Sequence, residues 1–554
     1  MRPLSFLLAI TLSAASLQAA DRYLVATRHA PREAQLRMLR QSDEFRSRGI
    51  RAFESANAFA ADLTASDIAE LKRSSEVRFI TPVVERHASV EDSSPRLVLR
   101  PDGSPYRSKQ TIPYGISLIH APELWSLTKG EGSINVAILD TGIDTKHPDL
   151  AANFAGGYNT FTLTDDPTDD NGHGTHVAGT IGAVDNNIGV VGVAPQVRIW
   201  SVKVLDKVGF GFDENVVAGV DWVIRKKHEI GGDWIMSLSL GSSQNSPIEE
   251  EAFKRVIAEG IIAVAAAGNR SFPDVEFPAA YDGVIGVGAI DSTSTLASFS
   301  DHGPHMSVVA PGVRVLSTAR TGSIPAAGVT LNDGASVTAA TIQGSSRGEM
   351  NGPFVACGIG NPEDFSASVR GKIALIRRGE LTFNQKVRNA EAAGAVSVVI
   401  YNKDNSDFRT WTLLRPDCDS IDGCDDPTHP WPIVLAISAA DGQRLLDDPS
   451  HIIDMGSWLD DYTILSGTSM ATPHASGAIA LVWSLAPSAT ATRVRDVMLS
   501  TTTDLGSPGF DLMYGYGLIN PVDAARKLAP GKFPPDETPS PDPRSGRGRS
   551  NSTP

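Results

Sequence analysis

The sequence has few cysteines, few aromatic residues and no long apolar run. Three cysteines occur among 554 residues, which excludes a small fold held together mainly by disulfides. Aromatic residues make up 6% of the chain and charged residues 20%, whereas 41% are hydrophobic. This composition is typical of a globular protein with a large core, and the length predicts about three or four domains.

Positive charge is also scarce. Lys and Arg total 49 against 64 Asp and Glu, so the formal net charge is −15. A protein that binds nucleic acid usually gathers basic residues on one face, so this balance disfavours a nucleic-acid partner. The 50 Gly and 35 Pro show no Gly-X-Y period, which excludes a collagen-like chain.

The first twenty residues predict a secretory signal peptide. They combine a charged start at Arg2, an apolar stretch of about a dozen residues, and small residues at Ala19 and Ala20. A membrane anchor needs at least about 18 consecutive apolar residues, so this stretch is too short. We therefore expect a secreted, extracellular protein, with or without passage through a periplasm, and no membrane association after the signal is removed.

Secretion would place the cysteines in an oxidising compartment, where one disulfide can form. The pair Cys418–Cys424 is favoured because the loop between them is short and polar, and Cys357 is then left over. The sequence leaves all three pairings open, as well as three free thiols. No His lies at ligand spacing around the cysteines, which argues against a zinc site.

The two ends of the chain differ from its middle. Residues 21–90 predict a small α/β unit, with a strand at Tyr23–Thr27 and an amphipathic helix over Glu33–Arg48. A polar, proline-containing linker follows at residues 91–109, and linkers of this kind are easily cut. Residues 530–554 are rich in Pro, Ser, Asp and Arg, and predict no ordered structure.

Between these ends, near-continuous apolar runs alternate with helical patterns around Glu214–Lys227 and Pro247–Glu259. Buried strands separated by helices are typical of a parallel sheet covered on both faces, so the expected fold class is α/β. In such sheets, ligands bind beyond the carboxyl ends of the strands. The expected strands are Ile134–Leu139, Val197–Leu205, Trp234–Leu240, Ile261–Ala267 and Val284–Ile290.

Three chemistry-bearing motifs lie where those carboxyl ends are expected. Asp140 follows the first strand, His173 begins a helix among glycines, and Ser469 begins an apolar helix. A carboxylate can orient an imidazole, the imidazole can activate a hydroxyl, and N–H groups at a helix N-terminus can stabilise an oxyanion. Each motif alone also fits a cap, a turn or a structural histidine. Their joint occurrence in the order Asp, His, Ser indicates nucleophilic catalysis.

The motifs read Asp140-Thr-Gly-Ile-Asp, His173-Gly-Thr-His-Val-Ala-Gly and Gly467-Thr-Ser-Met-Ala-Thr-Pro-His. In all three the chain resembles the subtilisin-like serine protease family. The resemblance implies a catalytic domain over residues 110–320 and 462–529, built on a mostly parallel sheet. It implies that Ser469 is the nucleophile, His173 the general base and then acid, and Asp140 the group that orients His173. The implied function is a secreted serine endopeptidase that cleaves protein or peptide substrates through an acyl-enzyme.

The resemblance extends to residues beside the nucleophile. The motif Ala265-Ala-Ala-Gly-Asn269 implies that the Asn269 amide donates to the oxyanion. Two short segments resemble the backbone edges that hold an extended substrate by strand addition. The implied substrate-binding residues are Gly209, Gly211, Ser239, Leu240 and Gly241.

The segment after the His173 helix resembles the family's calcium loop. An oxygen-only ligand set suits this hard cation. The alternative is a plain solvent loop without metal. The implied ligands are the side chains of Gln110, Asp149 and Asn186 and the carbonyl groups of Val184, Ile188 and Val190.

Two further segments resemble accessory parts of such proteases. Residues 21–90 resemble the inhibitory prosegment, which implies a proenzyme that is inhibited by its own segment and cuts its own linker. Residues 321–461 resemble the β-rich protease-associated domain inserted in some secreted members, here near the rim of the cleft. Within it, Arg377, Arg378 and Lys386 are expected to be surface or turn residues.

The specificity pocket is the least determined part. The segment Arg270–Tyr281 is shorter than its counterpart in subtilisin, so the P1 preference and any second calcium site stay open, with large apolar or aromatic P1 residues as the default. Two other classes of function predict different sequence features. A binding protein on a degenerate protease scaffold predicts a broken catalytic set, whereas a secreted esterase predicts Gly-x-Ser-x-Gly, which does not occur around Ser469.

Overall fold

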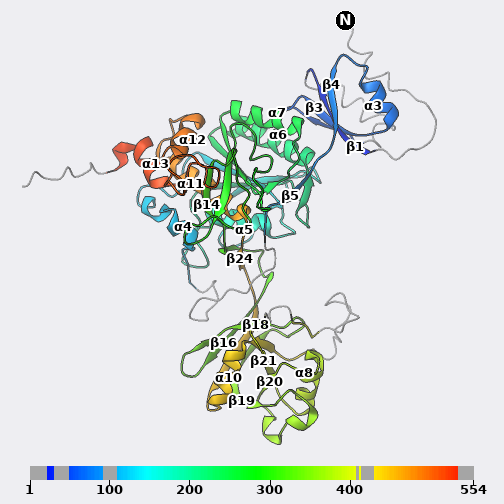
Figure 1. The fold of residues 1–554 in the computed structure, drawn as a ribbon, viewed down its shortest axis with the longest axis vertical. Coiled ribbons are helices and arrows are strands. Elements are labelled where there is room, and N and C mark those ends of the chain that lie inside the picture. Colours follow the sequence, from blue (N-terminus) through cyan, green and yellow to red (C-terminus); the bar gives the residue numbers. More distant parts are fainter. Residues whose placement is uncertain (1–20, 30–48, 92–108, 407–410, 414–429, 534–554) are drawn as a thin grey trace, which may run out of the picture.

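The fold is that of a computed structural model, which describes residues 21–29, 49–91, 109–406, 411–413 and 430–533. Three bodies follow one another in Figure 1: a small N-terminal unit, a large central domain, and an inserted domain below it. The signal peptide, the helix at Glu33–Arg48, most of the linker, and Cys418 and Cys424 lie outside the described residues.

A seven-stranded sheet in which every pair is parallel forms the centre of the large domain. All five predicted strands are present, so the predicted α/β class is confirmed. The strands β7 and β14 were not predicted, because the first contains two glycines and the second has only four residues. In spatial order the strands are β14 (Val308–Pro311), β13 (Ile285–Ile290), β12 (Ile261–Ala266), β10 (Asp233–Leu238), β6 (Ile134–Asp140), β8 (Arg198–Lys203) and β7 (Phe154–Asn159).

Helices cover both faces of this sheet. Val136 and Ile138 of β6 pack with the helices α5 (His173–Gly182) and α11 (Thr468–Leu485) in one apolar core. Ala137 and Leu139 point to the other face and pack in a second core. This alternation is the period-2 pattern of a strand buried on both sides. The second core contains α6 (Asp213–Ile230) and α7 (Pro247–Ala258), while α4 (Tyr114–Leu118), α12 (Ala491–Leu499) and α13 (Pro521–Leu528) join the first.

The N-terminal unit is a four-stranded antiparallel sheet with one helix, α3 (Ala65–Leu71). Leu24 and Ala26 on one face of β1 pack into the core formed by α6 and α7, whereas Val25 on the other face packs with Leu71. The unit therefore has one face sealed against the central domain. Its strands are β2 (Arg51–Phe53), β3 (Ala58–Leu63), β1 (Asp21–Thr27) and β4 (Val77–Pro82).

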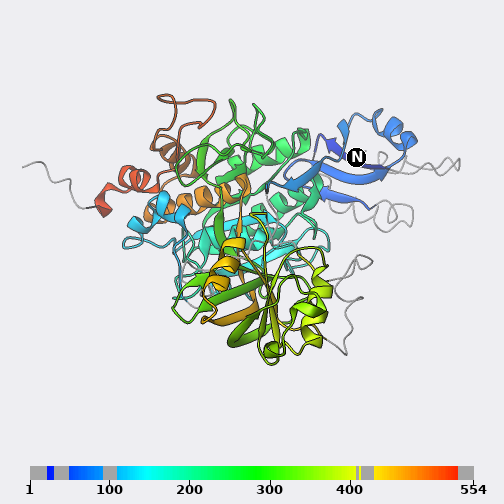
Figure 2. The same cartoon turned by 60° about the horizontal axis from the view of Figure 1, so that its bottom comes forward.

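The inserted domain is an eight-stranded mixed sheet with two helices, α8 (Phe383–Ala392) and α10 (Ala439–Asp447). It joins the central domain through an antiparallel stem of β15 (Val315–Thr318) and β24 (Tyr462–Leu465), and Figure 2 shows it turned toward the viewer. Its strands in spatial order are β17 (Ser336–Val337), β16 (Ile324–Leu331), β23 (Ile452–Asp460), β19 (Gly348–Ala356), β20 (Ile373–Arg377), β21 (Ser397–Tyr401), β22 (Val434–Ile437) and β18 (Ala339–Thr341).

Two expectations need correction. Lys386 is fully buried, because its ammonium donates to the carbonyl of Ile359 while its stem packs beside Gly360, so it is no surface residue. Pro530–Lys532 forms a short 3-10 turn, so ordered structure extends into the predicted tail.

Cys357 is a free, buried thiol. Among the described helices none is long and apolar enough to cross a membrane.

Candidate active site

The first pair of candidate residues meets at the carboxyl edge of the central sheet. Asp140 is the last residue of β6, and His173 is the first residue of α5. The Nδ1 atom of His173 lies 2.7 Å from Oδ1 of Asp140, and both side chains are buried. Burial opposes the charged imidazolium, but the Asp140 carboxylate outweighs it and raises the pKa of His173 above its usual value. The pair is therefore arranged to hold a proton on the His173 ring.

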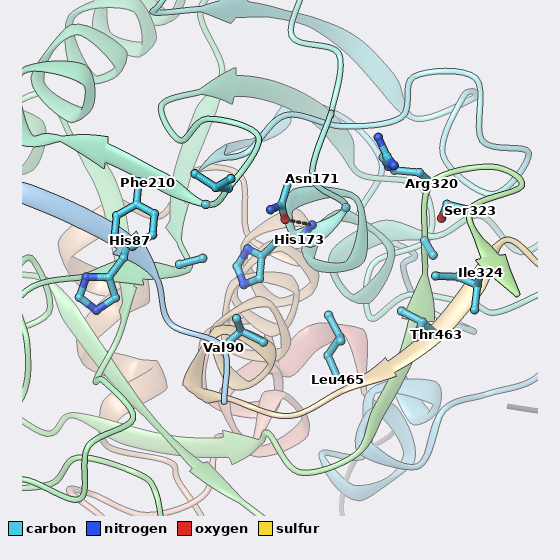
Figure 3. A pocket seen from close by; sticks show the side chains of 15 residues that line it. His87, Val90, Asn171, His173, Phe210, Arg320, Ser323, Ile324, Thr463 and Leu465 are labelled. Carbon is cyan, nitrogen blue, oxygen red and sulfur yellow. Dashed lines mark hydrogen bonds between the residues drawn. The ribbon is translucent and has the colours of Figure 1, made fainter. Parts of the chain in front are cut away.

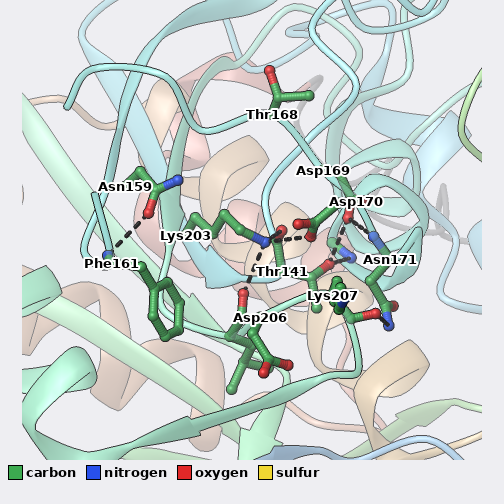
Figure 4. A network of polar contacts seen from close by, with 12 residues as sticks. Thr141, Asn159, Phe161, Thr168, Asp169, Asp170, Asn171, Lys203, Asp206 and Lys207 are labelled. Atoms are coloured by element: carbon green, nitrogen blue, oxygen red, sulfur yellow. Dashed lines mark hydrogen bonds and ion pairs between the residues drawn. The ribbon is translucent and has the colours of Figure 1, made fainter. Parts of the chain in front are cut away.

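A polar network joins the loop that follows Asp140 to the loop that precedes His173 (Figure 4). Asp169 accepts hydrogen bonds from the hydroxyl of Thr141 at 2.9 Å and from the amide of Thr175 at 3.1 Å. The Lys203 ammonium lies 2.6 Å from both the Thr141 carbonyl and a carboxylate oxygen of Asp170. Sequence reasoning did not single out Asp169 or Lys203; their adjacency to the Asp140 and His173 motifs was the available signal.

Ser469 is the second residue of α11, and no hydrogen bond joins its hydroxyl to His173 in the described structure. The Oγ atom donates to the carbonyl of Ser239 at 2.8 Å. Nε2 of His173 is buried and has no hydrogen-bond partner within the described part of the chain. A rotation of the Ser469 side chain about its Cα–Cβ bond is the step that would bring the hydroxyl to His173.

Asn269 follows β12 and is oriented by the residue before Ser469. Its Oδ1 atom accepts hydrogen bonds from the amide and the hydroxyl of Thr468, both at 2.9 Å. Its Nδ2 atom is therefore turned the other way, where it is buried without a partner in the described structure. A buried, unsatisfied donor costs free energy unless something accepts from it. The Asn269 Nδ2 atom and the Ser89 carbonyl oxygen both lie close to Gly467, because a Cβ on that glycine would be 3.2 Å from the first and 2.6 Å from the second.

A segment of the N-terminal unit occupies the groove in front of these donors. The carbonyl oxygen of Ser89 accepts a hydrogen bond from the amide of Ser469 at 3.1 Å, and the amide of Ser89 donates to the carbonyl of Ser239 at 3.2 Å. On the far side of this residue, the amide of Glu91 donates to the carbonyl of Ser466 at 2.9 Å. The peptide bond between Ser89 and Val90 thus lies at Ser469. Sequence reasoning placed this stretch at a domain boundary and expected the segment to block the cleft, but it did not name the residues that make the contacts.

The preceding residues lie in the groove as a strand. The strand β5 (Glu85–Ala88) pairs antiparallel with β9 (Phe210–Phe212) on one side and β11 (Leu240–Gly241) on the other. The Ala88 amide also donates to the Gly209 carbonyl at 3.0 Å. The five residues predicted to bind substrate backbone, Gly209, Gly211, Ser239, Leu240 and Gly241, all border this strand.

Glycine is required where the chain passes closest to the bound strand. Gly467 has φ of +155°, and a Cβ on it would lie 2.6 Å from the Ser89 carbonyl oxygen. Any side chain at this position would therefore clash with the carbonyl group held by Ser469.

A cavity of about 330 Å³ opens beside His173 (Figure 3). Val90 of the N-terminal segment and Leu465 of β24 line it, and Ser323 and Ile324 at the start of the inserted domain form another wall. The inserted domain therefore borders the groove on the side that follows the Ser89–Val90 bond, where its insertion point led us to expect a rim.

A buried acidic side chain, Glu276, lies beside Gly241 of β11. Glu276 is buried against two glycines, since a Cβ on Gly241 would lie 2.2 Å from its Oε2 atom and one on Gly268 would lie 2.7 Å from its Cγ atom. Burial raises the pKa of Glu276 to about 7, although the positive charge of Arg270 lowers it. The Arg270 Nη2 atom lies 2.7 Å from Oε1 of Glu276. Ser89, which precedes the peptide bond held at Ser469, is small and buried. The default of a large apolar or aromatic P1 residue stays a prediction.

The six predicted calcium ligands lie in one loop region. The Gln110 amide contacts the carbonyls of Val184 at 2.9 Å and Val190 at 3.4 Å. The Asn186 amide lies 3.0 Å from the Asp149 carboxylate, whose other oxygen accepts from the amide of Val190 at 3.0 Å. Asp149 is fully buried. Within the described residues no group of three or more His, Cys, Asp or Glu forms a metal site, so this set relies on amide and carbonyl oxygens.

The N-terminal unit also contacts charged side chains of α6. Arg22 forms a two-pronged ion pair with Glu214, with its Nη2 at 2.8 Å and its Nε at 3.0 Å from Oε2. The Asp221 carboxylate accepts a hydrogen bond from the amide of Ser55 at 2.8 Å. Oppositely charged and hydrogen-bonded groups therefore hold the unit in place besides the apolar face of β1.

Residues 131–356 match the model of the subtilase family, and residues 350–445 match that of the PA domain. The thermostable alkaline protease of Halalkalibacterium halodurans is 39% identical over 269 residues, which cover 49% of this chain and 67% of that protein. Subtilisin E of Bacillus subtilis is 37% identical over 271 residues, covering 48% of this chain and 64% of that protein. The chain thus spans about two thirds of the length of these relatives.

A solved structure agrees with these matches. The psychrophilic subtilisin-like protease Apa1 from the Antarctic psychrotroph Pseudoalteromonas sp. AS-11 superposes with a TM-score of 0.51 at 29% identity, covering 76% of this chain and 99% of that one. The predicted resemblance is confirmed. The chain belongs to the subtilase family of serine endopeptidases and carries an inserted PA domain.

Proposed function

We propose that this chain is a secreted serine endopeptidase that hydrolyses peptide bonds of proteins with Asp140, His173 and Ser469, and that its first substrate is its own Ser89–Val90 bond. The observation that carries the proposal is the Ser89 carbonyl oxygen, which accepts from the Ser469 amide at 3.1 Å with the unpartnered Asn269 amide nearby. A carbonyl that is held by one donor, with a second unpartnered donor near it and a nucleophile beside it, is the arrangement that acyl transfer requires.

The reaction begins when Ser469 rotates from the Ser239 carbonyl toward His173. The hydroxyl oxygen attacks the Ser89 carbonyl carbon while its proton passes to Nε2 of His173, and Asp140 stabilises the imidazolium. The developing oxyanion binds the Ser469 amide and the Asn269 side chain.

The bond between Ser89 and Val90 then breaks as His173 gives the proton to the Val90 nitrogen, leaving Ser89 as an ester on Ser469. Water, deprotonated by His173, attacks this ester and restores the Ser469 hydroxyl with a free Ser89 carboxylate.

The N-terminal unit acts in this proposal as an intramolecular inhibitor. After cleavage, the strand β5 still pairs with β9 and β11, so the product end blocks the groove until the unit dissociates. The ion pair of Arg22 with Glu214 adds to this hold. We infer secretion from the signal-peptide pattern of residues 1–20.

Calcium fits the loop around Asp149. One buried carboxylate, two side-chain amides and three carbonyl groups give an oxygen-only donor set of the kind that calcium binds. The carbonyl oxygens of Gln110 and Asn186 would face the ion after exchange of amide oxygen and nitrogen, which have nearly the same shape. When bound, calcium supplies charge that neutralises Asp149 and ties the loop to the start of the domain. No step of the reaction depends on it.

Active-site labelling tests the proposal. The secreted protein is treated with a fluorophosphonate, the adduct is located by peptide mass, and casein cleavage is followed in parallel. We expect one adduct on Ser469, and loss of both adduct and proteolysis in Ser469→Ala. Absence of an adduct on processed protein would contradict the proposal and favour a binding protein on a protease scaffold.

A further inference from the structure

The strongest side-chain contact between the bound segment and the groove is made by Arg86. If Ser89 is counted as the first residue before the Ser89–Val90 bond, Arg86 is the fourth. It pairs with Gly211 of β9. Its Nη2 atom lies 2.5 Å from Oε2 of Glu249, and its Nε atom lies 3.2 Å from Oε1. Both side chains are completely buried. Such a two-pronged contact matches the planar fork of arginine.

The partner of Arg86 belongs to the catalytic domain and stays when the prosegment leaves. Glu249 lies in the first turn of α7, and the Tyr281 hydroxyl is 2.9 Å from its Oε2 atom. The Asp213 carboxylate adds a second negative charge to the field at Arg86. Burial raises the pKa of Asp213 to about 6, so this group is ionised at pH 8. The base of this subsite is therefore acidic.

The neighbouring positions of the strand carry less side-chain information. Glu85 is exposed and the His87 side chain is 41% exposed, while the main-chain pairing with β9 and β11 is independent of sequence. Ser89 is buried, but its hydroxyl has no hydrogen-bond partner in the described structure. Arg86 is thus the position of the strand at which the groove binds a charged side chain, through Glu249.

An apolar residue at this position would leave the buried Glu249 carboxylate without its cation, and an acidic residue would repel it. We propose that Glu249, with Tyr281 and Asp213, forms a subsite that selects substrates carrying arginine four residues before the cleaved bond. This specificity rests on the proposed endopeptidase function. Lysine can place a charge there but offers no fork, so it should rank below arginine.

The test uses the secreted protein after release of its prosegment, at pH 8, with four internally quenched peptides. All contain Glu-Xaa-His-Ala-Ser-Val-Glu, with Xaa as Arg, Lys, Leu or Glu. We expect kcat/KM for the Arg peptide to exceed that for the Leu peptide by at least about 10-fold, and the Glu peptide to be the poorest. In Glu249→Gln the Arg-to-Leu ratio should fall to near one.

A matched control comes from the same helix. Glu251 pairs with Arg78 of the prosegment at 2.5 Å, away from β5, so Glu251→Gln should keep the wild-type ratio. Equal cleavage of the Arg and Leu peptides by the wild type, or a ratio unchanged in Glu249→Gln, would overturn the proposal. If Glu249→Gln fails to fold, the ranking of the four peptides by the wild type decides alone.

Failure of the proposed function itself would look different, because no peptide would then be cleaved. The same four sequences with a reduced, uncleavable Ser–Val bond are therefore tested for binding by fluorescence polarisation. Preferential binding of the Arg analogue supports the subsite whether or not the protein cleaves, and equal affinities contradict it.

Discussion

The amide of Ser469 donates to the carbonyl oxygen of Ser89 at 3.1 Å, so the chain holds one of its own peptide bonds at its candidate nucleophile. The Ser469 hydroxyl instead donates to Ser239, which leaves Nε2 of His173 without a partner in the described structure. In the proposed mechanism, one rotation of the Ser469 side chain therefore separates this state from one that is ready for attack.

Asn269 provides the first prediction. Asn269→Asp keeps an oxygen for the Thr468 amide and hydroxyl but replaces the Nδ2 donor with a second oxygen. Its kcat should fall by at least about 10²–10³, the loss seen when the corresponding donor is removed from subtilisin, with a smaller change in KM. Steady-state kinetics on a peptide substrate measure both. A variant with wild-type kcat and a raised KM would show that the Asn269 side chain binds the substrate ground state and the transition state equally.

The protonation of His173 provides the second prediction. Because the Asp140 carboxylate outweighs burial and raises the pKa of His173 above 6.5, the neutral base should be lost at a higher pH than for an ordinary histidine. The acid limb of kcat/KM should therefore have an apparent pKa above 6.5, and activity should fall as the pH drops through it.

Asp140→Asn removes the carboxylate that orients His173 and stabilises its proton, and kcat should fall by about 10⁴-fold. A variant that kept wild-type kcat with an unchanged acid limb would show that the 2.7 Å contact has no catalytic role.

Calcium removal provides the third prediction. A chelator should lower the Tm of the processed protein by about 5–10 °C, because an ion present at 100 times its Kd contributes about 2.7 kcal/mol. Asp149→Asn should have a low Tm that no longer responds to the chelator. The control is Asp185→Asn in the same loop, whose carboxylate is partly exposed and pairs with Lys129. A wild-type Tm that does not change when the chelator is added would show that the loop binds no calcium.

Prosegment docking provides the fourth prediction. Glu214→Gln removes the charge that Arg22 contacts through two nitrogens, and a partly buried pair of this kind is worth about 1 kcal/mol. Activity should appear severalfold sooner after secretion, with a larger difference at low salt. Glu229→Gln on the same helix, where Glu229 pairs with Lys226, should keep the wild-type time course. Identical delays in all three proteins would exclude a role for this ion pair.

The sequence predicts the fold more fully than the site. Ile134–Asp140 is a fully buried and mostly apolar strand, and such a run indicates a central place in a parallel sheet by itself. The pairing of Arg86 with Glu249 joins residues 163 positions apart, so no local pattern announces it. Lys386 shows the same limit, since its burial depends on a carbonyl in another loop.

The candidate site shows where a motif carries information and where it does not. Asp140, His173 and Ser469 are readable because their neighbours form long characteristic motifs. The direction of the Ser469 hydroxyl depends on the position of the Ser239 carbonyl, which is set by tertiary packing. Ser89 lies in a polar stretch without any motif, and only the paired strands β9 and β11 place it at the nucleophile.

The identity of the first cleavage site tests the central claim most directly. The full chain and its Ser469→Ala variant are secreted from a host that lacks other extracellular proteases, and intact mass and N-terminal sequence are determined for both. We predict a fragment that begins at Val90 in the wild type, from which further trimming proceeds, and an uncut junction in Ser469→Ala. Cleavage after Ser89 in the Ser469→Ala protein, or a wild-type first cut at another bond, would contradict the account.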